Sequence, residues 1–419
     1  MKNVLIICGT FPSQSFVGGL RPAMFAKYLT KFGWNPWVLT RDFTPEDPRY
    51  DEKMPVDLPS NIHHQICKVK YSLQDEQHYL QSRNILHKVR DFFYPEFSSP
   101  PGLYFAVKDA SKYIMEKHKF DLIFATAPDQ WELTLGEFLA KKYNIPLVED
   151  FRDILEQEIG FNRPVRQKLQ VARFSIRRYL TTRYATHITT VSEFHQITLQ
   201  RKLKRKTSIV YNGYDNAEFK PIHLSQNPVS PFRIIYLGRI LNTWYHNPQN
   251  LFTAIDQLIS EKQIRESDIS VEFYGTDKEK IDLILLDLKH PNFIKFKDRI
   301  SYTEVPQKLN EAQMLLLLTN RGRNGILTTK FFEYAGVKKP ILCIPGDKGE
   351  LDDLINKYNL GYSIGSLLTL KEKLVEWIKS FKVGSFPEHV SGNIEFFTRE
   401  NQTKIISEIF DKVINCKSK

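Results

Sequence analysis

The chain carries, at residues 324–350, the segment Asn324-Gly-Ile-Leu-Thr-Thr-Lys330-Phe-Phe-Glu333-Tyr-Ala-Gly336, then Val-Lys-Lys-Pro340-Ile-Leu-Cys-Ile-Pro345-Gly346-Asp-Lys-Gly-Glu350. This segment places a polar turn, a short helix and a buried strand in direct succession. The Asn-Gly pair permits a tight turn, and Thr328 and Thr329 are of the type that caps helices. We expect the chemistry of the protein in this segment.

Lys330 and Glu333 are three residues apart and therefore share one helical face. A helix start presents unpaired N–H groups and a positive dipole end, so a lysine beside it favours a phosphate. Glu333 would repel that phosphate, and a carboxylate there is more useful as an acceptor for the two hydroxyls of a ribose. An amphipathic helix with a surface Lys–Glu pair is the alternative interpretation.

The run Thr-Thr-Lys330-Phe-Phe-Glu333-Tyr-Ala-Gly, followed by Lys-Lys-Pro-Ile-Leu, resembles the donor-binding segment of retaining glycosyltransferase family 4. The resemblance implies that Glu333 holds the donor ribose. Many family members carry a second glutamate eight positions earlier, where this chain has Gly325. Asn324, or the backbone of Gly325 and Ile326, is then the candidate that faces the donor sugar. The implied donor-binding residues of this segment are Asn324, Gly325, Ile326, Leu327, Thr328 and Thr329.

The amino-terminal residues predict the start of a doubly wound α/β sheet. A continuous apolar run at 4–7 indicates a strand covered on both faces, and a helical pattern and a second strand at 36–40 follow it. Between strand and helix stand Gly18 and Gly19. They lack the pattern Gly-x-Gly-x-x-Gly, but in the family a glycine pair at this place approaches the donor diphosphate from the opposite domain. A flexible surface loop is the alternative.

Polar residues follow two further strands of this first domain. The strand at 120–125 leads to Gln130, and the strand at 145–148 leads to Asp150, Arg152 and Asp153, which resemble the Asp-x-Arg-Asp of many family members. Open α/β sheets bind ligands at the carboxyl ends of their strands. We therefore expect these four residues on the acceptor side of a cleft, with an ion-pair cluster that only shapes the loop as the alternative for the acidic group.

A second strand, glycine and helix sequence begins at 232–237 with Gly238 and Arg239 at its end. The family uses an arginine here for the donor diphosphate, and commonly a lysine five residues later, where this chain has Trp244. Because that lysine is absent, more of the stabilisation of the leaving diphosphate is assigned to Lys330. By resemblance, the turn at Arg299 and Ile300 contacts the donor base through its backbone.

Length and pattern together predict an α/β protein of two facing Rossmann-like doubly wound domains, the GT-B architecture, with an interdomain cleft. The expected divisions are an acceptor-side domain at 1–212, a nucleotide-sugar-binding domain at 213–391, and a terminal helix at 392–419 that packs back on the first domain. Residues 45–105 are rich in proline and aromatic residues and are interpreted as insertions with short helices, without an assigned role.

The net charge of +11 favours an anionic partner, which could be a nucleotide phosphate, an acidic membrane surface or nucleic acid. Residues 163–206 concentrate much of this charge in an amphipathic basic helix and a following cluster. We expect this region on the cytoplasmic face of an anionic membrane, near a lipid-linked acceptor, with a solvated helix face as the alternative.

The compartment expected from the sequence is the cytoplasm, with a peripheral position on the inner face of the membrane. The four cysteines show no paired spacing, and the first apolar run is too short for a signal peptide or a membrane span.

The resemblance implies a retaining, metal-independent hexosyltransferase that moves a sugar from a nucleoside diphosphate to a hydroxyl acceptor, in polysaccharide or glycolipid synthesis. Arg239 and Lys330, with Glu333, would form its catalytic set, with no cofactor beyond the donor substrate and no metal. A nucleotide-sugar 2-epimerase of the same fold is one alternative. A basic nucleic-acid-binding protein is the other, although no recognised nucleic-acid-binding module is found.

Overall fold

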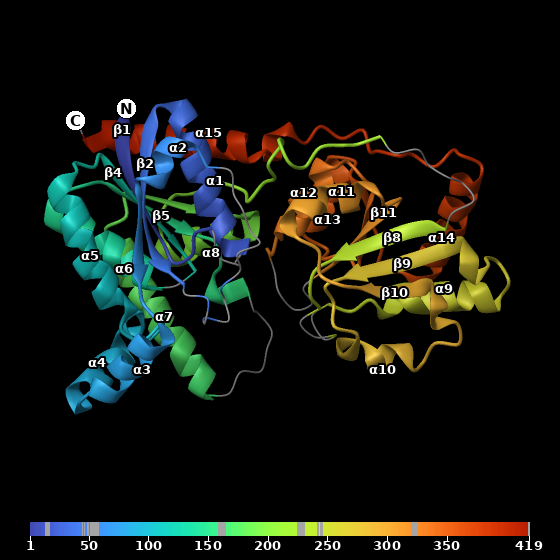
Figure 1. Cartoon of the computed structure of the whole chain (residues 1–419), viewed down its shortest axis with the longest axis horizontal. Helices are drawn as coiled ribbons and strands as arrows, with labels where there is room; N and C mark the ends of the chain where they lie inside the picture. The colour runs from blue at the N-terminus through green and yellow to red at the C-terminus, as the bar shows by residue number, and fades with distance from the viewer. Residues whose placement is uncertain are drawn as a thin grey trace. The chain divides into compact units, whose positions relative to one another are not determined.

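The computed structural model of the chain describes residues 1–12, 17–43, 45, 47, 50, 58–128, 130–157, 165–223, 231–240, 243, 246–319 and 325–417. The chain divides into two compact units (Figure 1). Unit 1 comprises Met1–Asn212 and Arg399–Lys419, and unit 2 comprises Gly213–Thr398. The terminal helix was expected from residue 392, whereas residues 392–398 fall in unit 2.

A parallel sheet forms the centre of unit 1. Its strands in the described residues are β1 (Lys2–Cys8), β2 (Trp34–Asp42), β3 (Ile66–Lys70), β4 (Leu122–Ala127), β5 (Leu147–Phe151), β6 (His187–Thr190) and β7 (Thr207–Ile209). They lie in the order β3-β2-β1-β4-β5-β6-β7. The order turns back at β1, so the sheet is doubly wound, as predicted.

Alternate residues of β1 serve two separate cores. Val4 and Ile6 pack into one hydrophobic cluster and Leu5 and Ile7 into another, because successive side chains of a strand point to opposite faces. This is why the run at 4–7 is apolar throughout rather than alternating. Both faces of the sheet are covered by helices.

The helices of unit 1 lie in two layers (Figure 1). Within the described residues they are α1 (Leu20–Leu29), α2 (Ser60–His63), α3 (Leu73–Ser82), α4 (Ile85–Phe93), α5 (Leu103–Lys117), α6 (Gln130–Tyr143), α7 (Val165–Thr182), α8 (Glu193–Leu203) and α15 (Arg399–Lys417). The last of these, α15, returns to unit 1 and packs beside α1. Its Phe410 meets the rings of Trp34 and Phe124, each at 5.3 Å between centroids.

Unit 2 repeats the architecture with a smaller parallel sheet. The described strands are β8 (Phe232–Leu237), β9 (Ile269–Tyr274), β10 (Ile294–Lys297), β11 (Met314–Leu318), β12 (Ile341–Ile344) and β13 (Gly361–Ser363), in the order β10-β9-β8-β11-β12-β13. The helices around them are α9 (Gln249–Ser260), α10 (Asp282–Leu285), α11 (Val305–Asn310), α12 (Thr329–Gly336), α13 (Glu350–Lys357) and α14 (Leu367–Lys382).

The segment at 45–105 contains more regular structure than the sequence indicated. It supplies β3, a parallel edge strand that pairs with β2, together with α3 and α4. The strand Ile-Cys-Lys-Val-Lys was missed because lysines interrupt its apolar residues, a composition suited to an edge exposed to solvent. Ser72 caps α3 and Asn84 caps α4 with their side chains, so both helix starts are encoded locally.

Candidate functional site

The donor-side residues of unit 2 are built around the carboxyl end of β8. Gly238 follows this strand with φ of +110°, a conformation that favours glycine, and its carbonyl accepts a hydrogen bond of 2.6 Å from Thr276 Oγ1. Arg239 comes next and is exposed. The end of β8 therefore combines the backbone of Gly238, which carries no side chain of its own, with the solvent-accessible guanidinium of Arg239.

Lys330 reaches this point from the first turn of α12. A β-carbon added to Gly238 would lie 3.0 Å from Lys330 Cε and 3.1 Å from its Nζ. The ammonium group thus rests against the glycine backbone, and no carboxylate among the described residues forms an ion pair with it. The fold therefore brings Gly238 and Lys330, which are distant in the sequence, into contact. The ammonium group of Lys330 stays available to bind an anion.

Tyr236 holds this arrangement and was missed by the sequence analysis. Its hydroxyl accepts a hydrogen bond of 3.1 Å from Lys330 Nζ and donates one of 3.3 Å to the carbonyl of Arg239. The sequence did offer a signal, since a tyrosine inside the strand predicted at 232–237 needs a partner for its hydroxyl once it is buried, and Tyr236 is 1% exposed. One buried side chain therefore links the two cationic residues.

We expect Tyr236→Phe to impair turnover while the fold is retained. Loss of a hydrogen bond to a charged group costs about 1.5 kcal/mol, or roughly a tenfold fall in kcat/KM. Because the hydroxyl positions Lys330 without touching substrate, the fall should appear in kcat more than in the affinity for the donor. Steady-state kinetics and donor titration of the two proteins measure this, and an unchanged kcat would contradict it.

The start of α12 differs in one respect from the expectation. Thr328 occupies the N-cap position, but it forms no side-chain cap hydrogen bond, and its Oγ1 is buried without a partner in the described part of the chain. Thr328 is therefore the N-cap residue, as predicted, but its side chain does not cap the helix. The side chain of Thr328 leaves the first N–H groups of the helix without a cap acceptor, which suits a site that receives an anion.

The remaining donor-side residues surround this helix start or the neighbouring strand. Gly325 has φ of +71° and is buried, Ile326 and Thr329 are half-buried, and Leu327 is buried. Asn324 and Trp244 lie outside the described residues. Arg299 is exposed and Ile300 half-buried after β10, next to Gly275 at the end of β9.

Glu333 lies one turn after Lys330 on α12 and is 8% exposed. It is followed by Tyr334, whose hydroxyl accepts a hydrogen bond of 3.3 Å from the backbone N–H of Leu237. Burial raises the pKa of Tyr334 far above its ordinary value, so this phenol stays neutral. The contact anchors α12 to β8, and the ribose role of Glu333 stays a prediction.

Asp150 of unit 1 has a different role from the one predicted. It is fully buried, and Arg21 binds both its oxygens, at 2.9 Å through Nε and 2.8 Å through the second guanidinium nitrogen. Thr126 and Thr189 each donate a further hydrogen bond of 2.8 Å. Its acceptor sites are occupied by the protein, so Asp150 is neither a cleft residue nor part of a solvated ion-pair cluster.

Arg152 connects two of the predicted regions. Its Nε donates to the carbonyl of Ala127 at 3.0 Å, and its guanidinium also donates to the carbonyl of Gly18. Gly18 and Gly19 form a 3-10 turn, Val17–Gly19, directly before α1. A β-carbon on Gly19 would lie 3.3 Å from Cα of Phe11, so a side chain there would press on the backbone of Phe11. Arg152 thus fixes the glycine turn to the end of β4.

Gln130 and Asp153 line a pocket of about 440 Å³ at the carboxyl ends of β4 and β5. Gln130 is buried and donates 3.1 Å to Thr181 Oγ1, whereas Asp153 is exposed. Most of the other described lining is apolar and includes Leu133 of α6, Phe151 at the end of β5, Ile154 after it, and Val171 and Phe174 of α7. The sequence did not reveal this pocket because its wall on α7 becomes evident only once the helix is placed over the strand ends.

His195 lies beside this region in the first turn of α8. It is 1% exposed, and neither ring nitrogen has a hydrogen-bond partner in the described residues. Burial lowers the pKa of His195 to about 4, against the opposing influence of Asp153 and Glu156. The imidazole is therefore neutral at physiological pH.

One group of described side chains has the composition of a metal site. His223, Glu388 and His389 can bring their ligand atoms within 4.8 Å of one another. Lys339 Nζ stands 3.9 Å from Glu388 Oε1 and would compete with a metal cation. The group lies near the residues that precede β12, whereas the predicted donor residues lie at strand carboxyl ends. The absence of a metal cofactor stays a prediction.

Residues 23–218 match the family model described as Glycosyltransferase Family 4. The predicted resemblance to glycosyltransferase family 4 is confirmed. The match covers most of unit 1 and ends before the segment at 324–350, so the roles of Lys330 and Glu333 rest on the local geometry and the sequence motif. No curated protein sequence matches the chain.

Solved structures similar to the chain have the two-domain GT-B fold of glycosyltransferases. A sucrose-phosphate synthase from Thermosynechococcus elongatus aligns with a TM-score of 0.66 and 12% identity over 99% of this chain and 100% of that one. HepE from Anabaena, in complex with UDP and glucose, aligns at 0.56 and 14% over 100% and 98%. A putative UDP-N-acetylglucosamine 2-epimerase from Listeria monocytogenes aligns at 0.53 and 12% over 98% and 96%. At these identities the likeness concerns the fold.

Proposed function

We propose that this protein transfers a hexosyl sugar from a nucleoside-diphosphate donor to a hydroxyl acceptor, with retention of configuration at the anomeric carbon. The observation that carries the proposal is the position of Lys330 Nζ, 3.1 Å from where a β-carbon of Gly238 would stand, beside Arg239 and at the start of α12. A diphosphate is the ligand that this combination of two cations, a bare glycine backbone and a helix start recognises. The complexes of HepE with UDP and glucose support the same donor class.

The difficult step is departure of the nucleoside diphosphate while the anomeric carbon develops positive charge. Lys330 and Arg239 stabilise the negative charge that accumulates on the leaving phosphate, and the Tyr236 hydroxyl keeps Lys330 in place for it. The leaving phosphate oxygen then takes the proton of the acceptor hydroxyl as the acceptor attacks the same face. Glu333 binds the donor ribose, and the turn at Arg299 and Ile300 meets the base.

The acceptor would bind in the 440 Å³ pocket of unit 1, which offers Gln130 and Asp153 for its hydroxyls and an apolar wall for the rest of the molecule. We expect no metal requirement, because the two cations already supply the positive charge that the diphosphate needs. Synthesis of a cell-surface polysaccharide or glycolipid in the cytoplasm would fit such an acceptor.

Thermal unfolding with a panel of nucleotide sugars tests the donor site. A cognate donor at one hundred times its dissociation constant stabilises the folded state by about 2.7 kcal/mol, and the unfolding temperature should rise accordingly. The rise is expected to vanish in Lys330→Ala and to survive EDTA. If no nucleotide sugar raises the unfolding temperature, the proposed donor site is wrong. If donor binding is lost in EDTA and returns with Mg²⁺, the proposed metal independence is wrong.

A 2-epimerase is the second candidate, favoured by the fold similarity to the putative enzyme from Listeria monocytogenes. Such a reaction needs ionisable groups that remove and return a proton at the sugar. Incubation with the cognate donor alone separates the two. Formation of a new sugar isomer supports the epimerase, whereas an unchanged donor that reacts only when acceptor is added supports the transferase.

A further inference from the structure

Helix α4 turns its apolar side toward solvent. Ile85, Leu86, Val89, Phe92 and Phe93 fall within one third of the helix circumference and are between 53% and 76% exposed. The side that faces the protein carries Asp91, which is 3% exposed and accepts hydrogen bonds from Arg83, Arg90 and Tyr79. A surface helix normally buries its apolar stripe, so this reversed orientation requires a partner.

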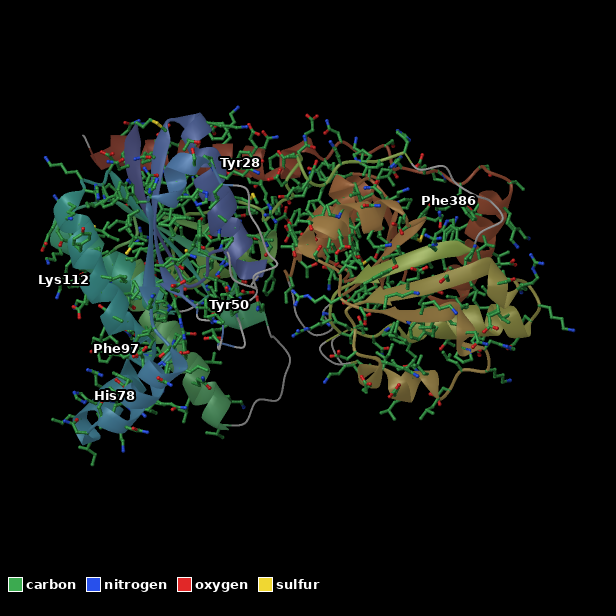
Figure 2. The ribbon with its side chains drawn as sticks, in the orientation of Figure 1. Tyr28, Tyr50, His78, Phe97, Lys112 and Phe386 are labelled. Atoms are coloured by element: carbon green, nitrogen blue, oxygen red, sulfur yellow. The ribbon has the colours of Figure 1, made fainter. Side chains whose placement is uncertain are left out.

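Helix α7 continues the same surface. Val165, Leu169 and Ile176 share its outer face and are each at least 60% exposed. The guanidinium of Arg173 on α7 lies 5.1 Å from the ring of Phe92 on α4, which places the two helices side by side. We call the exposed apolar residues of both helices the α4–α7 surface. Figure 1 shows α3, α4 and α7 extending together beyond the sheet of unit 1, and Figure 2 labels His78 and Phe97 in the same region.

Lysines flank the apolar stripes of the α4–α7 surface. Lys88 flanks the apolar stripe of α4, Lys168 flanks that of α7, and the stretch from 165 to 182 contains no acidic residue. In the structure, some of the basic residues at 163–206 are engaged within the protein and are not available to a partner. Arg177 is paired with Glu96 and Arg178 with Glu156, and Arg205 donates to backbone carbonyls.

We propose that the α4–α7 surface docks on an anionic lipid bilayer, with the apolar stripes entering the headgroup and acyl boundary and Lys88 and Lys168 contacting acidic headgroups. An apolar stripe bordered by lysines, with aromatic side chains at its edge, matches the composition of such a boundary. Phe92, Phe93 and Tyr179 supply those aromatic side chains. The absence of acids from α7 gives the charge complementarity that selects an anionic membrane over a neutral one.

Docking would also determine how the acceptor arrives. The inner face of α7, with Val171, Phe174 and Arg178, lines the 440 Å³ pocket, opposite the side that carries Leu169 and Ile176. If the proposed transferase function holds, a membrane-borne amphiphilic acceptor reaches this pocket across a single helix. This consequence rests on the proposed function, whereas membrane docking itself does not.

Vesicle co-sedimentation tests the docking without any sugar donor. The full chain should bind vesicles of phosphatidylglycerol and phosphatidylcholine at 3:7 at least about tenfold more tightly than pure phosphatidylcholine at 0.1 M salt. Ile85→Ser/Leu86→Ser/Val89→Ser should lower this binding about tenfold or more through loss of apolar contact. Lys88→Glu/Lys168→Glu should lower it as well and weaken its dependence on salt.

Matched controls come from surfaces of similar exposure. Leu283→Ser/Leu286→Ser, on α10 and at its C-cap, removes apolar residues that are 82% and 79% exposed. Lys112→Glu/Lys142→Glu reverses two exposed lysines of α5 and α6. Both should bind like the unchanged protein, and circular dichroism should show every variant folded. The proposal is overturned if the unchanged protein shows no preference for anionic vesicles, or if the triple serine variant binds as well as the controls. It is also overturned if the protein is a dimer that the triple variant dissociates while vesicle binding is absent, since a second copy would then cover the surface.

Discussion

Lys330→Ala and Arg239→Ala should each lower kcat/KM for sugar transfer by about 10²–10³-fold, which corresponds to ~2.7–4 kcal/mol of lost transition-state stabilisation. Charge on the departing diphosphate grows as the bond to the anomeric carbon breaks, so each cation is worth more in the transition state than in the bound donor. Lys330 stands against Gly238 at the end of β8, and Arg239 follows directly in the chain. Initial-rate assays with a cognate donor and acceptor measure the effect.

Neither variant should unfold the protein, because Arg239 is exposed and Lys330 is only partly buried. Lys357→Ala, which removes an exposed lysine from the last turn of α13, is the matched control and should retain full activity. The double variant should lose less than the sum of the two single losses, since Tyr236 couples the two residues through one hydroxyl. Activity near that of the control in either single variant would remove the residue from the catalytic set.

Arg21→Ala or Asp150→Ala should lower the free energy of unfolding of unit 1 by about 3–5 kcal/mol, because each leaves an unpaired charge in the interior. Arg21 is 5% exposed, and its remaining nitrogen donates to the carbonyl of Tyr211 at 3.0 Å, so the pair joins α1, β5 and the end of unit 1. Arg21→Met/Asp150→Leu should be less destabilised than either single variant, since it removes both charges. Urea denaturation measures the difference.

Asp153→Ala supplies the control for this second prediction. Asp153 is exposed three residues after Asp150, and its loss should change the free energy of unfolding by no more than about 0.5 kcal/mol. If Asp150→Ala is instead as stable as the unchanged protein but inactive, Asp150 belongs to the acceptor site. Equal effects at the two positions would show that burial does not distinguish them.

The Asp150 carboxyl also predicts how the stability of the protein depends on pH. Burial raises the pKa of Asp150, but the Arg21 guanidinium and the two threonine hydroxyls outweigh it, and the pKa lies below its ordinary value. A carboxyl whose folded pKa is depressed stabilises the protein at pH above its unfolded pKa, near ~4, and loses this contribution as the pH falls through the folded value. The stability lost between pH 5 and pH 2 should therefore be smaller in the Asp150 variant than in the unchanged protein.

Local pattern was sufficient for most of the architecture. The continuous apolar run at 4–7 and the largely apolar run at 232–237 became β1 and β8, because a central parallel strand is buried on both faces and is therefore rich in apolar residues. The short helix carrying Lys330 and Glu333 was also predictable, since both the turn before it and the strand after it are marked by residue type. The edge strand β3 was not, because lysines are tolerated where one side of a strand is unpaired.

The partners of charged and polar side chains were decided by the tertiary structure. Asp150 and Arg21 are 129 positions apart, and no local pattern states that they form a buried pair. The same holds for Tyr236 and Lys330, and for the direction in which α4 presents its apolar stripe. The sequence determined secondary structure and the motif that predicts a nucleotide sugar, because both depend on neighbours within a few residues. Only the fold determined which charges are satisfied internally and which face a ligand or a membrane, because that depends on contacts between segments distant in the chain.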